Sequence, residues 1–305
     1  MSRPDVTKAL QAFGCTVKEA EPMAAHTSFK IGGAADCFVS TGDLIQAALI
    51  LRHCTEKQIP LLVVGNGSNL LVSDSGIDGV VLHVDANAIE VSGTRMTVQA
   101  GASLTRACLT ACEHGLSGLE FAYGIPGTMG GGVYMNAGAY GGEMSQVVTL
   151  VEGFDMNGEP FSYTRPELMF SHRYSRLMDE EKLITHVTFQ LQPGDREALL
   201  AEMVDFNTRR AEKQPLTQFS AGSTFKRPAN GYASAMIDQC GLKGFAIGGA
   251  QVSEKHAGFC INKGGTAADF LALIAHVQGV VQSQFGTMLE PEVRILGEDA
   301  PVKEA

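Results

Sequence analysis

Two glycine-rich segments carry the residue types best suited to hold a ligand through the polypeptide backbone. The first, residues 63–70, reads VVGNGSNL, so an apolar run ends in small, hydroxyl-bearing and amide-bearing residues. Such a loop can expose backbone N–H groups that bind a pyrophosphate. It lacks the Gly-Lys-Ser/Thr of a P-loop, and Leu70 stands where the dinucleotide motif GxGxxG needs glycine. The residues therefore leave open a phosphate cradle or a plain structural turn.

The second segment, residues 124–142, reads GIPGTMGGGVYMNAGAYGG. Glycine at this density disfavours a regular helix. The apolar residues between the glycines, among them Val133 and Tyr140, disfavour a solvated linker. The segment predicts a tight-turning loop that forms a wall for a flat ligand, and a flexible surface loop is the alternative.

Composition and charge limit the classes of partner. The chain has 305 residues, of which 45% are hydrophobic and 18% charged, and its formal net charge is −10. This composition predicts a folded protein with a large core. The acidic balance disfavours nucleic acid and anionic membrane as partners. The uncharged run at residues 121–142 contains 8 glycines, so we expect no membrane insertion there.

Cysteine and histidine usage argues against disulfides and metals. The seven cysteines are scattered without a CxxC pair, and the eight histidines show no HxxxH spacing. We therefore expect reduced thiols and no metal site. Residues 1–10 contain no apolar stretch of signal-peptide length. Together these features predict a cytoplasmic protein, and they predict no particular oligomeric state.

Apolar periodicity predicts the elements that must position these segments. Helices are expected at residues 43–58, 103–114 and 195–213, and from Thr266 onward, where Thr266 and Asp269 form a capping box. Strands are expected at residues 61–64, 80–84, 88–100 (as a pair), 147–155, 159–163 and 184–191. Asn157-Gly158 is a typical hairpin turn. The pattern is α+β, with a smaller α/β lobe after Pro215.

Cationic side chains occur in the C-terminal third, where an anionic substrate could meet them despite the acidic total charge. A solvated surface position is an equal alternative for each of them. They are Lys226, Arg227, Lys243, Lys255, His256 and Lys263.

The order and spacing of the glycine segments resemble the FAD-binding fold of the vanillyl-alcohol oxidase/PCMH type. In that fold, the loops matching residues 65–69 and 124–128 hold the FAD pyrophosphate and line the isoalloxazine ring. The segment HTSFKIGGAAD at residues 26–36 and three later segments narrow the resemblance to the bacterial UDP-N-acetylenolpyruvoylglucosamine reductase family. The resemblance implies an α+β fold: a two-lobed PCMH-type FAD-binding domain, then a smaller α/β C-terminal substrate-binding domain. The implied ranges are 1–83 and 84–200 for the lobes, 201–297 for the substrate domain, and 298–305 for a tail.

The resemblance also implies the site residues. FSHRYS at 170–175, AGSTFKRP at 221–228 and LEPEVR at 289–294 match the family's arginine, serine and glutamate motifs. They imply Arg173 as the active-site cation, Ser223 as the proton donor and Glu292 as the active-site carboxylate. On a strand Glu290 would share the face of Glu292, so only the resemblance favours Glu292. The implied FAD contacts are Gly65, Asn66, Gly67, Ser68, Asn69, Gly124, Ile125, Pro126, Gly127, Thr128, Gly130, Gly131, Ala137 and Gly138, and the implied substrate contacts are Arg227 and Lys255.

The function implied is reduction of the enolpyruvyl ether of UDP-N-acetylglucosamine-enolpyruvate to UDP-N-acetylmuramate, a step of peptidoglycan precursor synthesis. Noncovalent FAD and the reductant NADPH are the implied cofactors. A serine is a poor acid, so we expect Lys226 or Arg227 to assist Ser223. The 50 residues from Arg173 to Ser223 leave no room for the extra loop of the family's type I members, which implies type II. The alternatives are a flavin oxidase of the same fold and a noncatalytic nucleotide- or sugar-binding protein.

Overall fold

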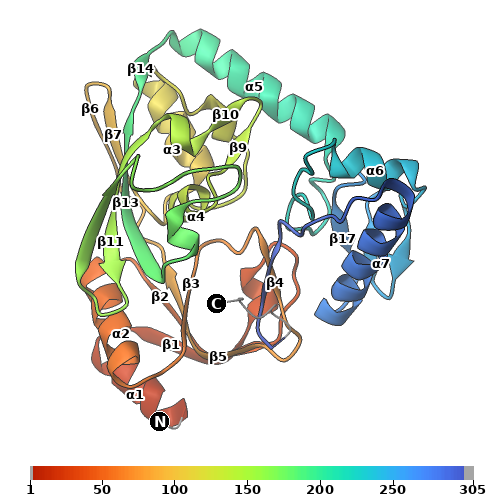
Figure 1. The fold of residues 1–305 in the computed structure, drawn as a ribbon. Helices are drawn as coiled ribbons and strands as arrows, with labels where there is room; N and C mark the ends of the chain where they lie inside the picture. The colour runs from red at the N-terminus through yellow and green to blue at the C-terminus, as the bar shows by residue number, and fades with distance from the viewer. Residues whose placement is uncertain (1–2, 299–305) are drawn as a thin grey trace. The chain divides into compact units, whose positions relative to one another are not determined.

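A computed structural model describes residues 3–298 (Figure 1). The chain divides into two compact units that alternate along the sequence. Unit 1 holds the described residues up to Glu19, Cys37–Asn66 and Gly79–Arg209, and unit 2 holds Ala20–Asp36, Gly67–Asp78 and the described residues from Arg210 onward. The ranges 1–83, 84–200 and 201–297 stay a prediction.

A four-stranded sheet forms the first layer near the N-terminus. Its strand order is β1-β2-β5-β3, for Thr16–Pro22, Ala34–Thr41, Ile77–Val84 and Leu61–Val64. In unit 1 the helices α1 (Arg3–Ala12) and α2 (Leu44–Glu56) contribute to the apolar core around this sheet. Asp43 begins α2, because its carboxylate accepts hydrogen bonds from the N–H groups of Ile45 and Gln46. The strand β3 pairs with β5 in parallel and ends at the first glycine loop.

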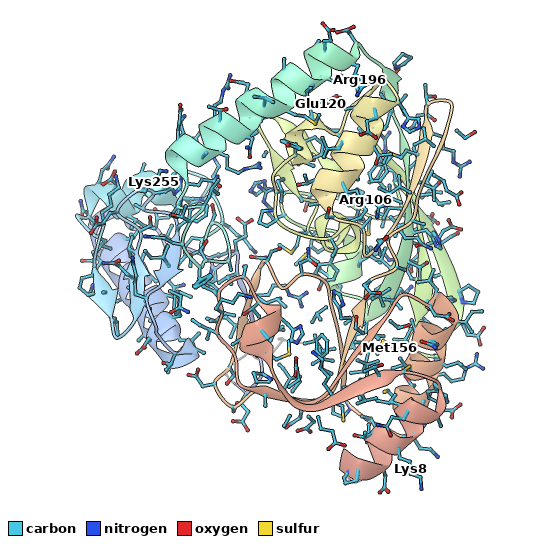
Figure 2. All side chains as sticks on the ribbon, turned by 180° about the vertical axis from the view of Figure 1, so that it is seen from behind. Lys8, Arg106, Glu120, Met156, Arg196 and Lys255 are labelled. Carbon is cyan, nitrogen blue, oxygen red and sulfur yellow. The ribbon has the colours of Figure 1, made fainter. Side chains whose placement is uncertain are left out.

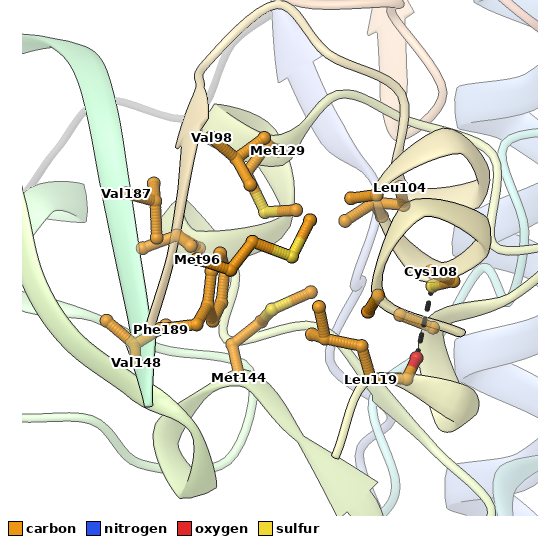
Figure 3. Packing of buried hydrophobic residues seen from close by; sticks show 14 of the residues in the cluster. Met96, Val98, Leu104, Cys108, Leu119, Met129, Met144, Val148, Val187 and Phe189 are labelled. Carbon is orange, nitrogen blue, oxygen red and sulfur yellow. Dashed lines mark hydrogen bonds between the residues drawn. The ribbon is translucent and has the colours of Figure 1, made fainter. Parts of the chain in front are cut away.

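A five-stranded antiparallel sheet lies wholly within unit 1. Its order is β12-β11-β13-β7-β6, for Pro160–Thr164, Val148–Asp155, Lys182–Gln190, Arg95–Gln99 and Ile89–Ser92. The helices α3 (Leu104–Glu113) and α4 (Met129–Tyr134) lie against this sheet (Figure 1). Figure 3 shows the core between these layers, where the thiol of Cys108 donates to the carbonyl of Leu119 at 3.1 Å. This core supports α4, which begins at the second glycine loop.

Short elements and one long helix complete unit 1. The strand pairs are β8 (Leu116–Ser117) with β14 (Gln192–Pro193) and β9 (Gly138–Ala139) with β10 (Gly142–Glu143), and the 3-10 turns are η2 (Glu120–Ala122), η3 (Met144–Gln146) and η4 (Arg176–Met178). The helix α5 (Arg196–Lys213) begins after Asp195, whose carboxylate accepts from the N–H of Ala198. Tyr140 stacks on Phe206 of α5 at 4.4 Å between ring centroids, which fixes the loop after β9 to that helix.

Unit 2 packs two helices against small sheets. Its elements are η1 (Met23–His26), β4 (Leu70–Val72), α6 (Ala233–Gln239), β15 (Ala246–Ile247), β16 (Ala250–Val252), β17 (Cys260–Asn262), α7 (Ala267–Phe285) and β18 (Arg294–Leu296). The strand β18 pairs with β4 in parallel, and β15-β16-β17 form an antiparallel sheet against α7. Thr266 and Asp269 form the capping box at the start of α7, as predicted.

The predicted α+β class and the main predicted elements are confirmed. One expectation is wrong: residues 129–134 form the helix α4 inside the segment predicted as a loop. Gly130 and Gly132 permit this helix, since a Cβ on either would lie 3.0 Å from Ala100 or Leu104. The close packing gained there outweighs the low helix propensity of glycine.

Two further features bear on the sequence-based expectations. All seven cysteines are free thiols. No helix among residues 3–298 is both long and apolar enough to cross a bilayer.

Candidate active site

The first predicted loop starts directly after β3, at Gly65. A Cβ placed on Gly65 would lie 2.4 Å from Oγ1 of Thr128, a residue of the second predicted loop. Thr128 is the N-cap of α4, where its hydroxyl accepts from the N–H of Gly131 at 3.4 Å. The start of the first loop therefore lies against the second loop in unit 1. A cofactor that contacts both loops needs them to be this close.

The backbone of these loops offers donors for a phosphate. Within residues 3–298, the N–H groups of Asn66 and Gly127 have no hydrogen-bond acceptor. Asn66 and Gly131 are exposed. Backbone donors beside glycine surfaces fit a cofactor that carries a pyrophosphate and a flat ring, which is the chemistry of FAD.

Gly65 gives a direct test of this cradle. Gly65→Ala should weaken FAD retention about 10–100-fold, because the new Cβ would overpack Thr128 at a cost of about 1–3 kcal/mol. The measurement is the ratio of flavin to protein after extensive dialysis. Gly279→Ala is the control, because a Cβ there meets nothing within 4 Å. Equal flavin retention in both variants would contradict the assignment.

The other predicted loop residues are divided between the units. Unit 1 holds Gly65, Asn66, Gly124, Ile125, Pro126, Gly127, Thr128, Gly130, Gly131, Ala137 and Gly138, and unit 2 holds Gly67, Ser68 and Asn69. Gly67 has φ +60°, and a Cβ there would lie 2.1 Å from the carbonyl oxygen of His26. The Nδ2 of Asn69 donates to the carbonyl of Glu292 at 3.1 Å, so this amide links the first loop to the glutamate motif within unit 2.

Arg173 lies at the tip of a tight turn in unit 1. Ser171 and Tyr174 close the turn by donating to each other's carbonyls, both at 3.1 Å. Arg173 has φ +54°, a left-handed conformation that non-glycine residues adopt at an energetic cost. Its Nη1 donates to the carbonyl of Asn136 at 3.4 Å and its Nη2 to the carbonyl of Gly138 at 2.8 Å. The guanidinium is thereby fixed against the second glycine loop.

An ion network anchors the segment that follows this turn. Glu180 accepts from Nε of Arg176 at 2.5 Å, from Nζ of Lys182 at 2.8 Å and from the hydroxyl of Tyr163 at 2.8 Å. Burial opposes ionisation, but the hydrogen bonds from these three side chains outweigh it and lower the pKa of Glu180 to about 2. The network ties η4 to the strands β12 and β13.

This network has a predicted pH signature. Since the pKa falls from 4.5 to about 2 on folding, the stabilisation is complete above about pH 4.5 and is lost as the pH falls through 2. Glu180→Gln should lower the free energy of unfolding by about 1 kcal/mol at pH 7, and the difference from wild type should shrink with acidification. Urea unfolding across pH measures it. Glu159→Gln, in an exposed pair with Arg52, should cost almost nothing, and equal losses would refute the account.

The serine and glutamate motifs lie side by side in unit 2. Phe225 and Pro291 form an antiparallel bridge, and the N–H of Glu292 donates to the carbonyl of Thr224 at 2.8 Å. Thr224 is buried, and its hydroxyl accepts from the N–H of Cys260 at 2.9 Å. The backbones beside Ser223 and Glu292 are therefore held together. Ser223 itself is exposed.

The two glutamates differ in their surroundings. Glu290 pairs with Nζ of Lys226 at 3.1 Å, and its side chain is 71% exposed. Glu292 is partly buried, and both its N–H and its carbonyl are hydrogen-bonded. Arg227 is the other side chain expected to assist Ser223. Its Cζ lies 4.0 Å from the ring centroid of Tyr232, and its Nε donates to the carbonyl of Gly231. Among the described residues, neither Lys226 nor Arg227 donates to Ser223.

Other basic side chains of unit 2 differ in their surroundings. Nζ of Lys255 (labelled in Figure 2) donates to the carbonyl of Ala211 at 2.6 Å, in the last turn of α5, where helix carbonyls lack intrahelical donors. Lys243 pairs with Asp238 at 2.7 Å. Burial lowers the pKa of His256, so the imidazole is neutral at pH 7. Lys255 remains exposed.

Sequence reasoning missed the residues that hold the site in place. Asn136, Thr224 and Glu180 each join segments distant in sequence, and only Asn136 carried a local signal, since asparagine tolerates the left-handed backbone. Within residues 3–298, no three His, Cys, Asp or Glu side chains are placed to hold a metal ion.

The comparisons with known proteins match two regions of the chain. Residues 35–162 match the FAD binding domain, and residues 214–296 match the C-terminal domain of UDP-N-acetylenolpyruvoylglucosamine reductase. The fold and the glycine cradle thus define a flavin-binding oxidoreductase. The chain belongs to the UDP-N-acetylenolpyruvoylglucosamine reductase family, as the resemblance predicted.

Relatives and one solved structure carry this assignment. The reductase of Caldanaerobacter subterraneus subsp. tengcongensis is 47% identical over 280 residues, 91% of this chain and 93% of the relative. That of Clostridium botulinum is 48% identical over 281 residues, 92% of each. The crystal structure of the Thermus caldophilus reductase has a TM-score of 0.80 at 32% identity and covers 93% of this chain and 100% of that one. The predicted fold class and FAD cofactor are therefore confirmed.

Proposed function

We propose that this protein reduces the enolpyruvyl ether of UDP-N-acetylglucosamine-enolpyruvate to UDP-N-acetylmuramate, with NADPH as reductant. The observation that carries the proposal is the pairing, on one chain, of an FAD binding domain at 35–162 with the reductase's C-terminal domain at 214–296. When bound, FAD would carry the hydride from NADPH to the substrate. The residues that would hold it are the glycine loop residues named above.

Arg173 is the cation of this reaction. Hydride adds to the terminal carbon of the enolpyruvyl group, and negative charge develops on the carboxylate before the adjacent carbon is protonated. A fixed guanidinium stabilises that charge more in the transition state than in the ground state. The carbonyls of Asn136 and Gly138 carry no formal charge, so they orient the guanidinium without cancelling its charge.

Ser223 donates the proton to the carbon that bears the carboxylate. Its hydroxyl has no hydrogen-bond partner within residues 3–298, so it is available to a substrate. The pairing of Glu290 with Lys226 supports Glu292 as the site carboxylate. The proton that Ser223 loses must be replaced, and neither Lys226 nor Arg227 is hydrogen-bonded to it among the described residues.

Arg227 and Lys255 bind the anionic part of the substrate. Both are exposed and cationic, which supports a role toward a diphosphate, and the contacts of Arg227 with Tyr232 and Gly231 orient it without removing its charge. The segment between Arg173 and Ser223 is filled by η4, β13, β14 and α5, which supports the type II form. The seven free thiols support a cytoplasmic location.

The proposal is tested by steady-state turnover of the purified protein. NADPH consumption should depend on UDP-N-acetylglucosamine-enolpyruvate, and the product should carry two more hydrogens by mass spectrometry. Consumption of O₂ with a sugar or alcohol in place of that substrate would instead indicate a flavin oxidase. A purified protein without flavin absorption would indicate a noncatalytic binding protein.

A further inference from the structure

Asn136 connects the glycine loop of unit 1 to the turn that carries Arg173. We propose that Asn136 is a positioning residue: its side-chain amide and its carbonyl together fix the place of the Arg173 guanidinium. The inference rests on the proposed role of Arg173 and deepens it. It is carried by contacts that all lie within unit 1.

Three hydrogen bonds converge on Asn136 from two other segments. Its Nδ2 donates to the carbonyl of Ser171, at the base of the turn, at 2.8 Å. Its Oδ1 accepts from the N–H of Ser145 in η3 at 2.9 Å. Its own carbonyl accepts from Nη1 of Arg173 at 3.4 Å. Asn136 is thus hydrogen-bonded both to the backbone of the turn and to the Arg173 side chain at its tip.

The chemistry of these partners fixes the orientation of the amide. A carbonyl can only accept and an N–H can only donate, so only one of the two orientations of the Asn136 amide can bond both the carbonyl of Ser171 and the N–H of Ser145. Asn136 is fully buried, and its φ of +43° lies in the left-handed region that asparagine tolerates. An unpaired polar group at this depth would be costly, so the arrangement is strongly determined.

This fixation matters because Arg173 is otherwise poorly restrained by its own backbone. Its φ of +54° is strained, and the reciprocal bonds of Ser171 and Tyr174 close the turn. Without the side-chain amide of Asn136, we expect the turn to relax and the guanidinium of Arg173 to shift from its position. A shift of about 1 Å in a charge-stabilising group is enough to slow a reaction about 100-fold.

Two variants separate the contacts. Asn136→Gly removes the whole amide but keeps a residue that accepts φ of +43°. Asn136→Asp keeps an acceptor for Ser145 and loses the donor to Ser171. Hydrogen exchange should accelerate at residues 143–147 and 171–174 in Asn136→Gly, and at 171–174 alone in Asn136→Asp. Val187→Ala, a buried cavity variant of the same core, is the stability control and should accelerate neither segment selectively.

Kinetics of the holoenzyme show whether the position serves the reaction. In Asn136→Gly, reduction of the flavin by NADPH should stay within about twofold of wild type, and reoxidation by substrate should slow about 10–100-fold. In an Arg173→Ala background, Asn136→Gly should slow reoxidation no further, because the group it positions is absent.

The outcomes distinguish this inference from the proposed function. If Arg173→Ala leaves reoxidation unchanged, the role of Arg173 fails, and the positioning role fails with it. If Arg173→Ala slows reoxidation but Asn136→Gly and Val187→Ala behave alike, only the positioning role is overturned. If neither Asn136 variant folds with bound flavin, Asn136 is a folding residue and the inference is likewise overturned.

Discussion

Replacing Arg173 by alanine is expected to slow substrate-dependent reoxidation of the flavin about 10²–10³-fold, the usual cost of removing one charge-stabilising group. Reduction of the flavin by NADPH should be almost unchanged, because in the proposed role Arg173 stabilises charge that develops on the substrate's carboxylate. Stopped-flow measurement of the two half-reactions separates the effects. Arg173→Lys should recover part of the rate, since lysine keeps the charge but lacks the planar fork of donors.

The backbone conformation of Arg173 supplies the control for this result. Because φ is +54°, alanine at this position adds strain that glycine does not. Arg173→Gly and Arg173→Ala should therefore share the same slow reoxidation and differ in stability by up to about 1 kcal/mol. A rate that follows stability across the two variants would show that the loss comes from backbone strain, and the assigned role would be wrong.

Ser223→Ala is expected to lower turnover about 10²–10⁴-fold, the range typical of losing a general acid. The flavin should still be reduced by NADPH at its normal rate, because no proton from Ser223 is needed in that step. Ser223 is exposed and its hydroxyl bonds to no described residue, so the thermal midpoint should hardly change. Normal turnover would rule out the proton-donor role.

Thr224 provides a matched comparison for the serine. Thr224 is buried and directly follows Ser223 in the chain. Thr224→Ala removes the hydroxyl that accepts from the N–H of Cys260. It should destabilise the protein without abolishing turnover. If the two variants lost activity equally, the effect at Ser223 would reflect disturbed packing of the motif and not a missing proton.

The regular elements of this fold were predictable because local signals agree with tertiary packing. Thr266 begins a helix where the sequence predicted a capping box, and Asp43 and Ser103 cap helices at the start of the predicted ranges 43–58 and 103–114. Asn157-Gly158 joins β11 to β12, as its hairpin signal predicted. The helix α4 was not predictable from propensity. Gly130 and Gly132 allow close approach to Ala100 and Leu104, a constraint that appears only when the sheet and α3 are in place.

The sequence indicates candidate site residues, but it does not indicate the contacts that support them. Segments far apart in the chain were recognised as motifs, yet their joining depends on pairings such as β4 with β18, which no local pattern encodes. Asn69 illustrates the difference. The resemblance implies a cofactor contact for this residue. Its side chain also donates to the carbonyl of Glu292, a contact across 223 positions of sequence that no local pattern predicts.

The central claim, that this chain passes reducing equivalents from NADPH to an enolpyruvyl sugar nucleotide through FAD, is tested most directly under anaerobic conditions. The purified protein is first mixed with NADPH, which should bleach the visible flavin absorption. Addition of UDP-N-acetylglucosamine-enolpyruvate should then restore that absorption, with UDP-N-acetylmuramate formed in equal amount. Flavin that stays reduced after the substrate is added would contradict the account.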